Sequence, residues 1–167
     1  MQLNDSLTDS ETSQMDIQNS SVSDSTEHIT EQYVIVELRN QIKDNILEII
    51  GNDDLYNIEF INDFEIEELV IVDCFNSVPK LKNPRIKKLE FQFCGIYCLN
   101  ELQLPNLEVF YLYEEQSICD GNILSILGQH KKLKELVLGC DINLDLKLIK
   151  ELQLTKLELS YCEVNKF

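Results

Sequence analysis

The feature of this sequence that most constrains its fold is a pattern of four residue positions, at fixed distances from one another, that recurs along the chain. In the segment LTKLELSYC, the spacing is set by Leu154, Leu157, Leu159 and Cys162. The same spacing returns four times upstream, in copies that begin at Leu133, Leu107, Ile86 and Ile66. Successive starts are 21, 26, 21 and 20 residues apart. Self-similarity at a near-constant period of this size is typical of repeat proteins, in which each unit buries its core against its neighbours.

The pattern Leu-x-x-Leu-x-Leu-x-x-Asn/Cys resembles the leucine-rich repeat family, and the resemblance covers residues 66–167. It implies an α/β fold, a leucine-rich repeat solenoid with a short parallel β-sheet on its concave face. The convex return segments are then mostly irregular, with one helix expected between Asp120 and His130, where Asp120 or Asn122 is the N-cap. Parallel strands need a crossover at each step, and the residues between the copies supply it.

One alternative register exists in the third copy. The segment ELQLPNLE at residues 101–108 is similar to ELQLTKLE at residues 151–158. If these two segments are aligned, the third copy begins at Leu104. We favour Leu107, because Pro105 and Asn106 lead into it as Pro84 and Arg85 lead into Ile86.

Three segments are expected. Residues 1–30 hold 11 Ser or Thr together with scattered acids, a composition that predicts a disordered acidic tail. Residues 31–65 are expected to form a helical N-terminal cap followed by a degenerate first repeat with Leu55, Ile58 and Phe60 at repeat offsets. Residues 66–167 hold the clear repeats.

The helix of the cap is expected at about Arg39 to Ile50. Leu38, Ile42, Ile46 and Ile49 lie at helical offsets and stop before Gly51. The β-branched run YVIVEL at residues 33–38 leaves a strand open as the alternative.

The charge and the apolar runs narrow the class of partner. A net charge of -16 argues against nucleic acid and against anionic membranes, since both need clustered Lys and Arg. A basic protein surface would be attracted instead. No apolar run approaches the ~20 residues of a membrane span, and no signal peptide is recognised. We therefore expect an intracellular protein with reduced cysteines.

No recognisable motif predicts catalysis, a cofactor or a metal site. The only histidines are His28 and His130. Cys94 and Cys98 form a Cys-x-x-x-Cys pair, but no second cysteine pair or histidine lies at zinc-site spacing from it. Cys74, Cys94 and Cys162 share one repeat position and are expected to be structural. Cys140 lies outside that position, and an exposed, reactive Cys140 in a thiol-dependent enzyme is the alternative.

The expected binding surface is the concave strand face, because aromatic residues are enriched at interface hot spots. The predicted partner-binding residues are Phe93, Tyr111, Tyr113, Tyr161, Glu90, Glu114 and Glu158. The alternative is that some of these aromatic rings fold down onto the sheet. We expect a non-enzymatic module that binds a protein partner. A substrate-recognition adaptor of a ubiquitin-ligase type assembly is the second reading, since the Cys form of the repeat also resembles such adaptors.

Three further expectations concern packing and charge. Leu136 and Leu157 should be fully buried. The eight acids from Asp53 to Asp73 predict an acidic lobe, opposed by a basic cluster in the next repeat. At the C-terminal edge, either Phe167 folds back, or the chain self-associates weakly, or further repeats are missing from the sequence.

Overall fold

A computed structural model of the chain describes residues 34–51, 58–73, 80–94, 102–113, 123–140 and 143–164. The chain divides into two compact units, Met1–Val34 and Ile35–Phe167, and the sheet described below belongs to the second. The predicted disordered tail over residues 1–30 lies outside the described residues, as do Leu55, Cys74 and Phe167. Within the described ranges, no helix has both the length and the apolar character that crossing a membrane requires.

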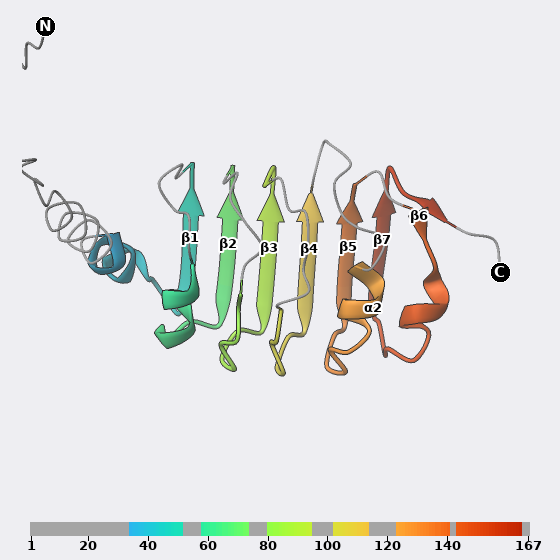
Figure 1. The fold of residues 1–167 in the computed structure, drawn as a ribbon, viewed down its shortest axis with the longest axis horizontal. Coiled ribbons are helices and arrows are strands. Elements are labelled where there is room, and N and C mark those ends of the chain that lie inside the picture. The colour runs from blue at the N-terminus through green and yellow to red at the C-terminus, as the bar shows by residue number, and fades with distance from the viewer. Residues whose placement is uncertain are drawn as a thin grey trace, which may run out of the picture. The chain divides into compact units, whose positions relative to one another are not determined.

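Six parallel strands form the main sheet, and each pairs with the next strand of that sheet along the sequence (Figure 1). They are β1 (Ile46–Ile50), β2 (Glu68–Val72), β3 (Lys88–Gln92), β4 (Val109–Tyr113), β5 (Glu135–Gly139) and β7 (Lys156–Ser160). A separate pair of short parallel strands consists of β6 (Asn143–Leu144) and β8 (Glu163–Val164). The fold is therefore α/β with a parallel sheet.

The register of the strands follows the leucine spacing. The second and fourth residues of each strand stack in two inward columns, which are Leu47–Leu69–Leu89–Phe110–Leu136–Leu157 and Ile49–Ile71–Phe91–Leu112–Leu138–Leu159. From β1 to β5 every member of both columns is buried. Phe110 and Leu112 pair with Leu89 and Phe91, which confirms that the third copy opens at Leu107 and not at Leu104.

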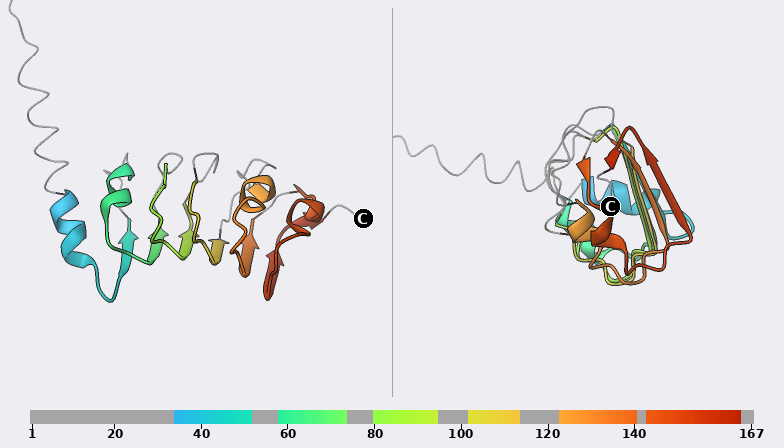
Figure 2. Two further views of the ribbon diagram at one scale, coloured as in Figure 1. Left: turned by 90° about the horizontal axis from the view of Figure 1, so that it is seen from below. Right: turned by 90° about the vertical axis from the view of Figure 1, so that its right-hand side faces the viewer.

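The connections run on the other side of this core, opposite the strands (Figure 2). In the described part of the chain they include the short helices η1 (Glu59–Asp63), α2 (Ile123–Leu127) and η2 (Leu146–Ile149). The helix α2 confirms the one expected between residues 120 and 130, although its candidate N-caps lie outside the described residues. Gly128, just after α2, has no room for a side chain, since a Cβ there would meet the Leu148 carbonyl oxygen at 2.5 Å.

The buried side chain of Asn83 links two neighbouring connections by hydrogen bonds. The Asn83 side-chain amide donates to the carbonyl oxygens of Ile61 at 3.0 Å and of Phe64 at 2.9 Å. Its Oδ1 accepts from the Arg85 backbone N–H. These bonds satisfy backbone groups that an irregular segment would otherwise bury without a partner.

The predicted N-terminal helix is present, but its predicted bounds, Arg39 to Ile50, are wrong, as is the alternative strand. Residues 34–41 are helical, so the β-branched run lies mainly in the helix, and Ile46–Ile50 forms β1. Between them, Asp44 and Asn45 both have positive φ, 53° and 64°, and Lys43 and Ile46 exchange two backbone hydrogen bonds. This is the geometry of a two-residue turn with φ > 0 at both central positions, which directs the chain into a strand.

The degenerate first repeat placed at Leu55, Ile58 and Phe60 is also wrong. Ile58 precedes η1 and Phe60 lies within it, so both belong to the connection between β1 and β2. The first repeat is β1 itself, because Leu47 and Ile49 pair with Leu69 and Ile71.

The last strand departs from the expected burial. Leu136 on β5 is fully buried as predicted, but its register partner Leu157 on β7 is 44% exposed. Within the described residues no strand pairs with the far edge of β7, so the inward column loses one neighbour there. The three expectations for the C-terminal edge concern residues beyond Val164 and stay predictions.

Candidate protein-interaction surface

The surface predicted to bind a partner is the side of the sheet that faces away from the core. We call this the outer face. It consists of the first, third and fifth residues of the strands, which form three rows across the sheet. These rows are Ile46–Glu68–Lys88–Val109–Glu135–Lys156, Glu48–Val70–Glu90–Tyr111–Val137–Glu158 and Ile50–Val72–Gln92–Tyr113–Gly139–Ser160. Burial alternates along β1 to β4 as the sequence predicted. It does not alternate on β5, where Val137 and Gly139 are also buried, or on β7, where Leu157 is exposed.

Tyr111 is held in place by three polar side chains. Its hydroxyl donates to Glu135 on β5, and the ammonium groups of Lys156 and Lys88 lie 4.9 and 5.8 Å from its ring centroid. Val137, directly opposite Tyr111 on β5, is only 1% exposed. The ring therefore lies across β5, as the alternative reading expected.

The hydrogen bond to Glu135 also changes the acidity of Tyr111. The carboxylate accepts a hydrogen bond from the phenolic O–H, and this bond together with partial burial raises the pKa of Tyr111 to about 12. The phenol is therefore neutral at physiological pH and fixed as a donor, which keeps the orientation of the ring defined.

Tyr113 extends the aromatic surface toward the carboxyl ends of the strands. Its ring meets that of Tyr111 edge-on, with centroids 6.3 Å apart. On the neighbouring strand Gly139 has no side chain, and the Tyr113 ring lies 3.5 Å from where its Cβ would be. Burial raises the pKa of Tyr113.

Phe93 and Tyr161 follow the ends of β3 and β7 and are the most exposed of the predicted aromatics, at 46% and 84%. Both adopt left-handed backbone conformations, with φ of 54° and 62°. Phe93 adjoins Tyr113, since its N–H donates to the Tyr113 carbonyl oxygen at 2.8 Å. Tyr161 lies three strands from Phe93, or about 14 Å. Of the four aromatics, Tyr111 and Tyr113 are thus on the outer face with their rings in contact, and Phe93 and Tyr161 lie just beyond the carboxyl ends of β3 and β7.

The predicted acidic residues are mostly paired. Glu90 accepts from Gln92 at 2.6 Å and lies 3.6 Å from Lys88. Glu158 lies 3.6 Å from Lys156. Glu114 lies outside the described residues.

The predicted acidic lobe and its basic neighbour form ion pairs across adjacent repeats. These are Glu59–Lys80, Glu65–Arg85, Glu67–Lys87 and Glu68–Lys88, at 2.8 to 3.4 Å. Where the strands begin, one row alternates in sign from repeat to repeat as Glu67, Lys87, Glu108 and Lys134. The Lys134–Glu108 distance is 2.6 Å, and Lys134 lowers the pKa of Glu108. Four of the six acids of the lobe that the structure describes are thus paired with cations of the neighbouring segment.

The cysteine position has the structural role expected of it. The thiol of Cys94 is buried and donates to the carbonyl oxygens of Ile71 and Gln92, both at 3.2 Å. Cys162 makes the equivalent contacts with the carbonyl oxygens of Leu138 and Ser160, and its thiol also lies 3.2 Å from the carbonyl oxygen of Cys140. The expectation of an exposed Cys140 is wrong, because this residue is completely buried.

Both ring nitrogens of His130 are engaged in hydrogen bonds with backbone groups. Its Nδ1 donates to the Ile126 carbonyl oxygen at 3.1 Å, and its Nε2 accepts from the Leu104 N–H at 3.4 Å. Burial lowers the pKa of His130, which favours this neutral form. Among the residues that the structure describes, no cluster of His, Cys, Asp or Glu has a geometry suited to a metal ion.

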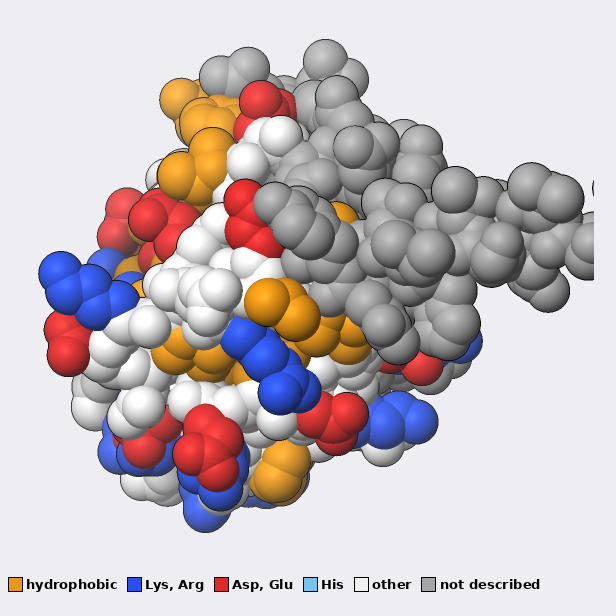
Figure 3. Space-filling model, turned by 90° about the vertical axis from the view of Figure 1, so that its left-hand side faces the viewer, with side chains coloured by type: hydrophobic (Ala, Val, Ile, Leu, Met, Phe, Trp, Pro, Cys, Tyr) orange, Lys and Arg blue, Asp and Glu red, His pale blue; other side chains and the backbone are white. Residues whose placement is uncertain are grey.

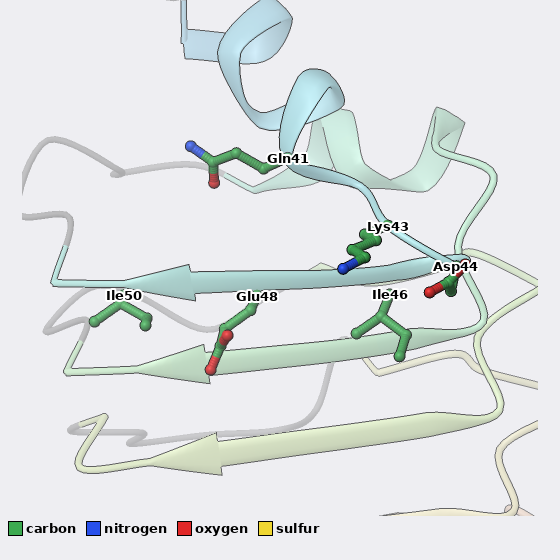
Figure 4. A pocket seen from close by; sticks show the side chains of 6 residues that line it. All are labelled: Gln41, Lys43, Asp44, Ile46, Glu48 and Ile50. Atoms are coloured by element: carbon green, nitrogen blue, oxygen red, sulfur yellow. The ribbon is translucent and has the colours of Figure 1, made fainter.

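A hollow of about 590 Å³ at the β1 end of the sheet was missed by the sequence reasoning. Its lining residues are Gln41, Lys43, Asp44, Ile46, Glu48 and Ile50 (Figure 4). Figure 3 views the molecule from this end, where hydrophobic side chains lie among charged ones. The sequence feature that could have indicated the strand beside this hollow is the Asp44–Asn45 turn, followed by the alternation of Leu47 and Ile49.

Comparison with known proteins gives no match to a family model, to a curated protein or to a solved structure. The resemblance to leucine-rich repeats thus stays a prediction from the spacing.

Proposed function

We propose that residues 46–164 form a leucine-rich repeat solenoid that acts as a non-enzymatic protein-interaction module. The observation that supports this proposal is the pair of Tyr111 and Tyr113 at the centre of the outer face, whose rings are fixed by contacts within the sheet. Phe93, whose backbone is hydrogen-bonded to Tyr113 just beyond the end of β3, is 46% exposed.

Fixed aromatic rings suit binding, because little side-chain entropy is lost when a partner covers them. Tyrosine also offers both an apolar ring and a polar hydroxyl, which is why it is frequent at hot spots. Here the strands that carry the rings are hydrogen-bonded on both sides, so the surface is rigid.

The positions of the nucleophiles agree with a binding role. The thiols of Cys94 and Cys140 are buried, and both nitrogens of His130 are engaged in structural hydrogen bonds. The partner that fits is a protein with apolar and hydrogen-bonding groups opposite the rings and a basic rim. The outer face carries five glutamates against two lysines in its three rows.

The test uses the full chain as bait in lysate of the cell of origin, followed by direct titration of each captured protein. Tyr113→Ala should weaken binding of a true partner about 30-fold, the effect of a 2 kcal/mol hot spot. Leu148→Ser is the matched control, because Leu148 is an exposed hydrophobic residue on η2, away from the outer face. Equal binding by wild type and Tyr113→Ala for every captured protein would refute the proposal.

A further inference from the structure

The free edge of β1 carries backbone groups that have no partner among the described residues. The Gly51 N–H donates to Val72 of β2, and the Asn45 carbonyl oxygen accepts from β2, so odd-numbered residues of β1 point toward β2. Because strand residues alternate, the N–H and C=O groups of Ile46, Glu48 and Ile50 point to the opposite edge. The backbone N–H and C=O groups of Ile46 are hydrogen-bonded to Lys43. The backbone groups of Glu48 and Ile50 have no hydrogen-bond partner among the described residues.

The side chains above this edge form a defined chemical pattern. Ile46, Glu48 and Ile50 project from the same side of β1 into the hollow (Figure 4). Ile50 is 64% exposed, and the carboxylate of Glu48 has no ion pair within the described residues. The other charged groups lining the hollow, Lys43 and Asp44, have opposite signs. The hollow is therefore acidic at its centre, with an apolar residue on each side.

We propose that the β1 edge binds an extended segment of a partner protein by strand addition, with a Lys or Arg of that segment opposite Glu48 and an apolar residue opposite Ile50. Main-chain hydrogen bonds to Glu48 and Ile50 would supply affinity, and the side chains on the shared face would supply selectivity. Side chains directly opposite each other on neighbouring strands interact, and opposite charges are favourable there. The same sheet already contains such a pair, Glu68 and Lys88.

A second copy of this chain fits the edge less well. Two-fold pairing of β1 with β1 sets Glu48 against Glu48 or Ile50 of the copy. Addition of β1 to the free edge of β7, in the register used throughout the sheet, sets Glu48 against Glu158. Neither arrangement supplies a cation, and like charges directly opposite are destabilising.

This surface is separate from Tyr111 and Tyr113, so the proposal does not depend on the function proposed above. The probe is the synthetic peptide Thr-Ile-Thr-Lys-Thr-Ile-Thr, which presents the same side chains in either strand direction. Its control carries Glu in place of Lys. Fluorescence anisotropy with the full-length protein should show saturable binding of the Lys peptide below about 1 mM. Hydrogen exchange should show slowed amides at Glu48 and Ile50.

Charge reversal tests the assigned pair. Glu48→Lys should weaken binding of the Lys peptide about five- to tenfold and should strengthen binding of the Glu peptide. Glu158→Lys, in the same row on β7, and Tyr113→Ala should leave both titrations unchanged. The proposal is overturned if Glu48→Lys has no effect, if Glu158→Lys has the same effect, or if the Glu48 and Ile50 amides exchange unchanged. Sedimentation showing that the peptide-free protein self-associates through this edge would also overturn it, in favour of a second copy.

Discussion

Replacing Leu136 or Leu157 by alanine tests whether anything covers the apolar flank of β7, the edge strand of the sheet. The two residues lie opposite each other on adjacent strands and occupy the same repeat position. Leu136 is fully buried, whereas Leu157 is 44% exposed. They are therefore a matched pair: Leu136 has a neighbouring strand on both sides, whereas Leu157 has a described strand on one side only.

The expected costs follow from this burial. Leu136→Ala loses the full transfer free energy of the removed carbons and leaves a cavity between β4 and β7, which costs about 2 to 5 kcal/mol. At Leu157 roughly half of that apolar contact is already absent, and water fills the space left by the truncation. Leu157→Ala should therefore cost about 1 kcal/mol.

Urea unfolding followed by circular dichroism, at several protein concentrations, measures both values. The reasoning is refuted if Leu157→Ala costs as much as Leu136→Ala at every concentration. That result would mean that the flank of β7 is covered within the protein itself. A Leu157 cost that grows with protein concentration would instead show that another copy covers it.

Two further predictions concern the outer face. Tyr111 has a pKa near 12 in the folded protein and about 10 when unfolded, so its contribution to stability is complete below pH 10 and is lost as the pH rises toward 12. Tyr111→Phe should flatten the decline in stability over that range, and tyrosinate absorbance should show one fewer late-titrating group; an unchanged slope contradicts the Glu135 hydrogen bond. Tyr161→Gly should stabilise the protein by about 1 kcal/mol, because it relieves a left-handed backbone at a side chain that is mostly in water. Gln92→Gly, one residue before the left-handed position on β3, is the control and should destabilise; a loss of stability in both variants would refute the strain argument.

Five of the six strands of the main sheet were predictable because the leucine spacing sets both the strand position and the register. In a parallel sheet with one buried side, Leu69, Leu89 and Phe110 must stack, and a slip of one residue would turn them outward. The strand β1 was missed for two reasons. Position 44 holds Asp where the repeat has Leu, and the apolar residues from Leu38 to Ile49 fit helical offsets as well as strand alternation.

The candidate surface was predictable as a set of rows but not in its details. Alternation places Tyr111 and Tyr113 on the outer face whatever their contacts are. The orientation of Tyr111 depends on Glu135 and Lys156, which are far away in sequence.

The alternating row of Glu67, Lys87, Glu108 and Lys134 constrains how such a chain can change in length. Duplicating one unit, or deleting the unit that carries Lys87 or Glu108, would place two glutamates or two lysines side by side at the new junction, whereas Glu67 now pairs with Lys87 and Glu108 with Lys134. Duplicating or deleting two adjacent units would keep every junction between opposite charges. Within these repeats, gene rearrangements that add or remove units in pairs are therefore the ones that the charge pattern tolerates.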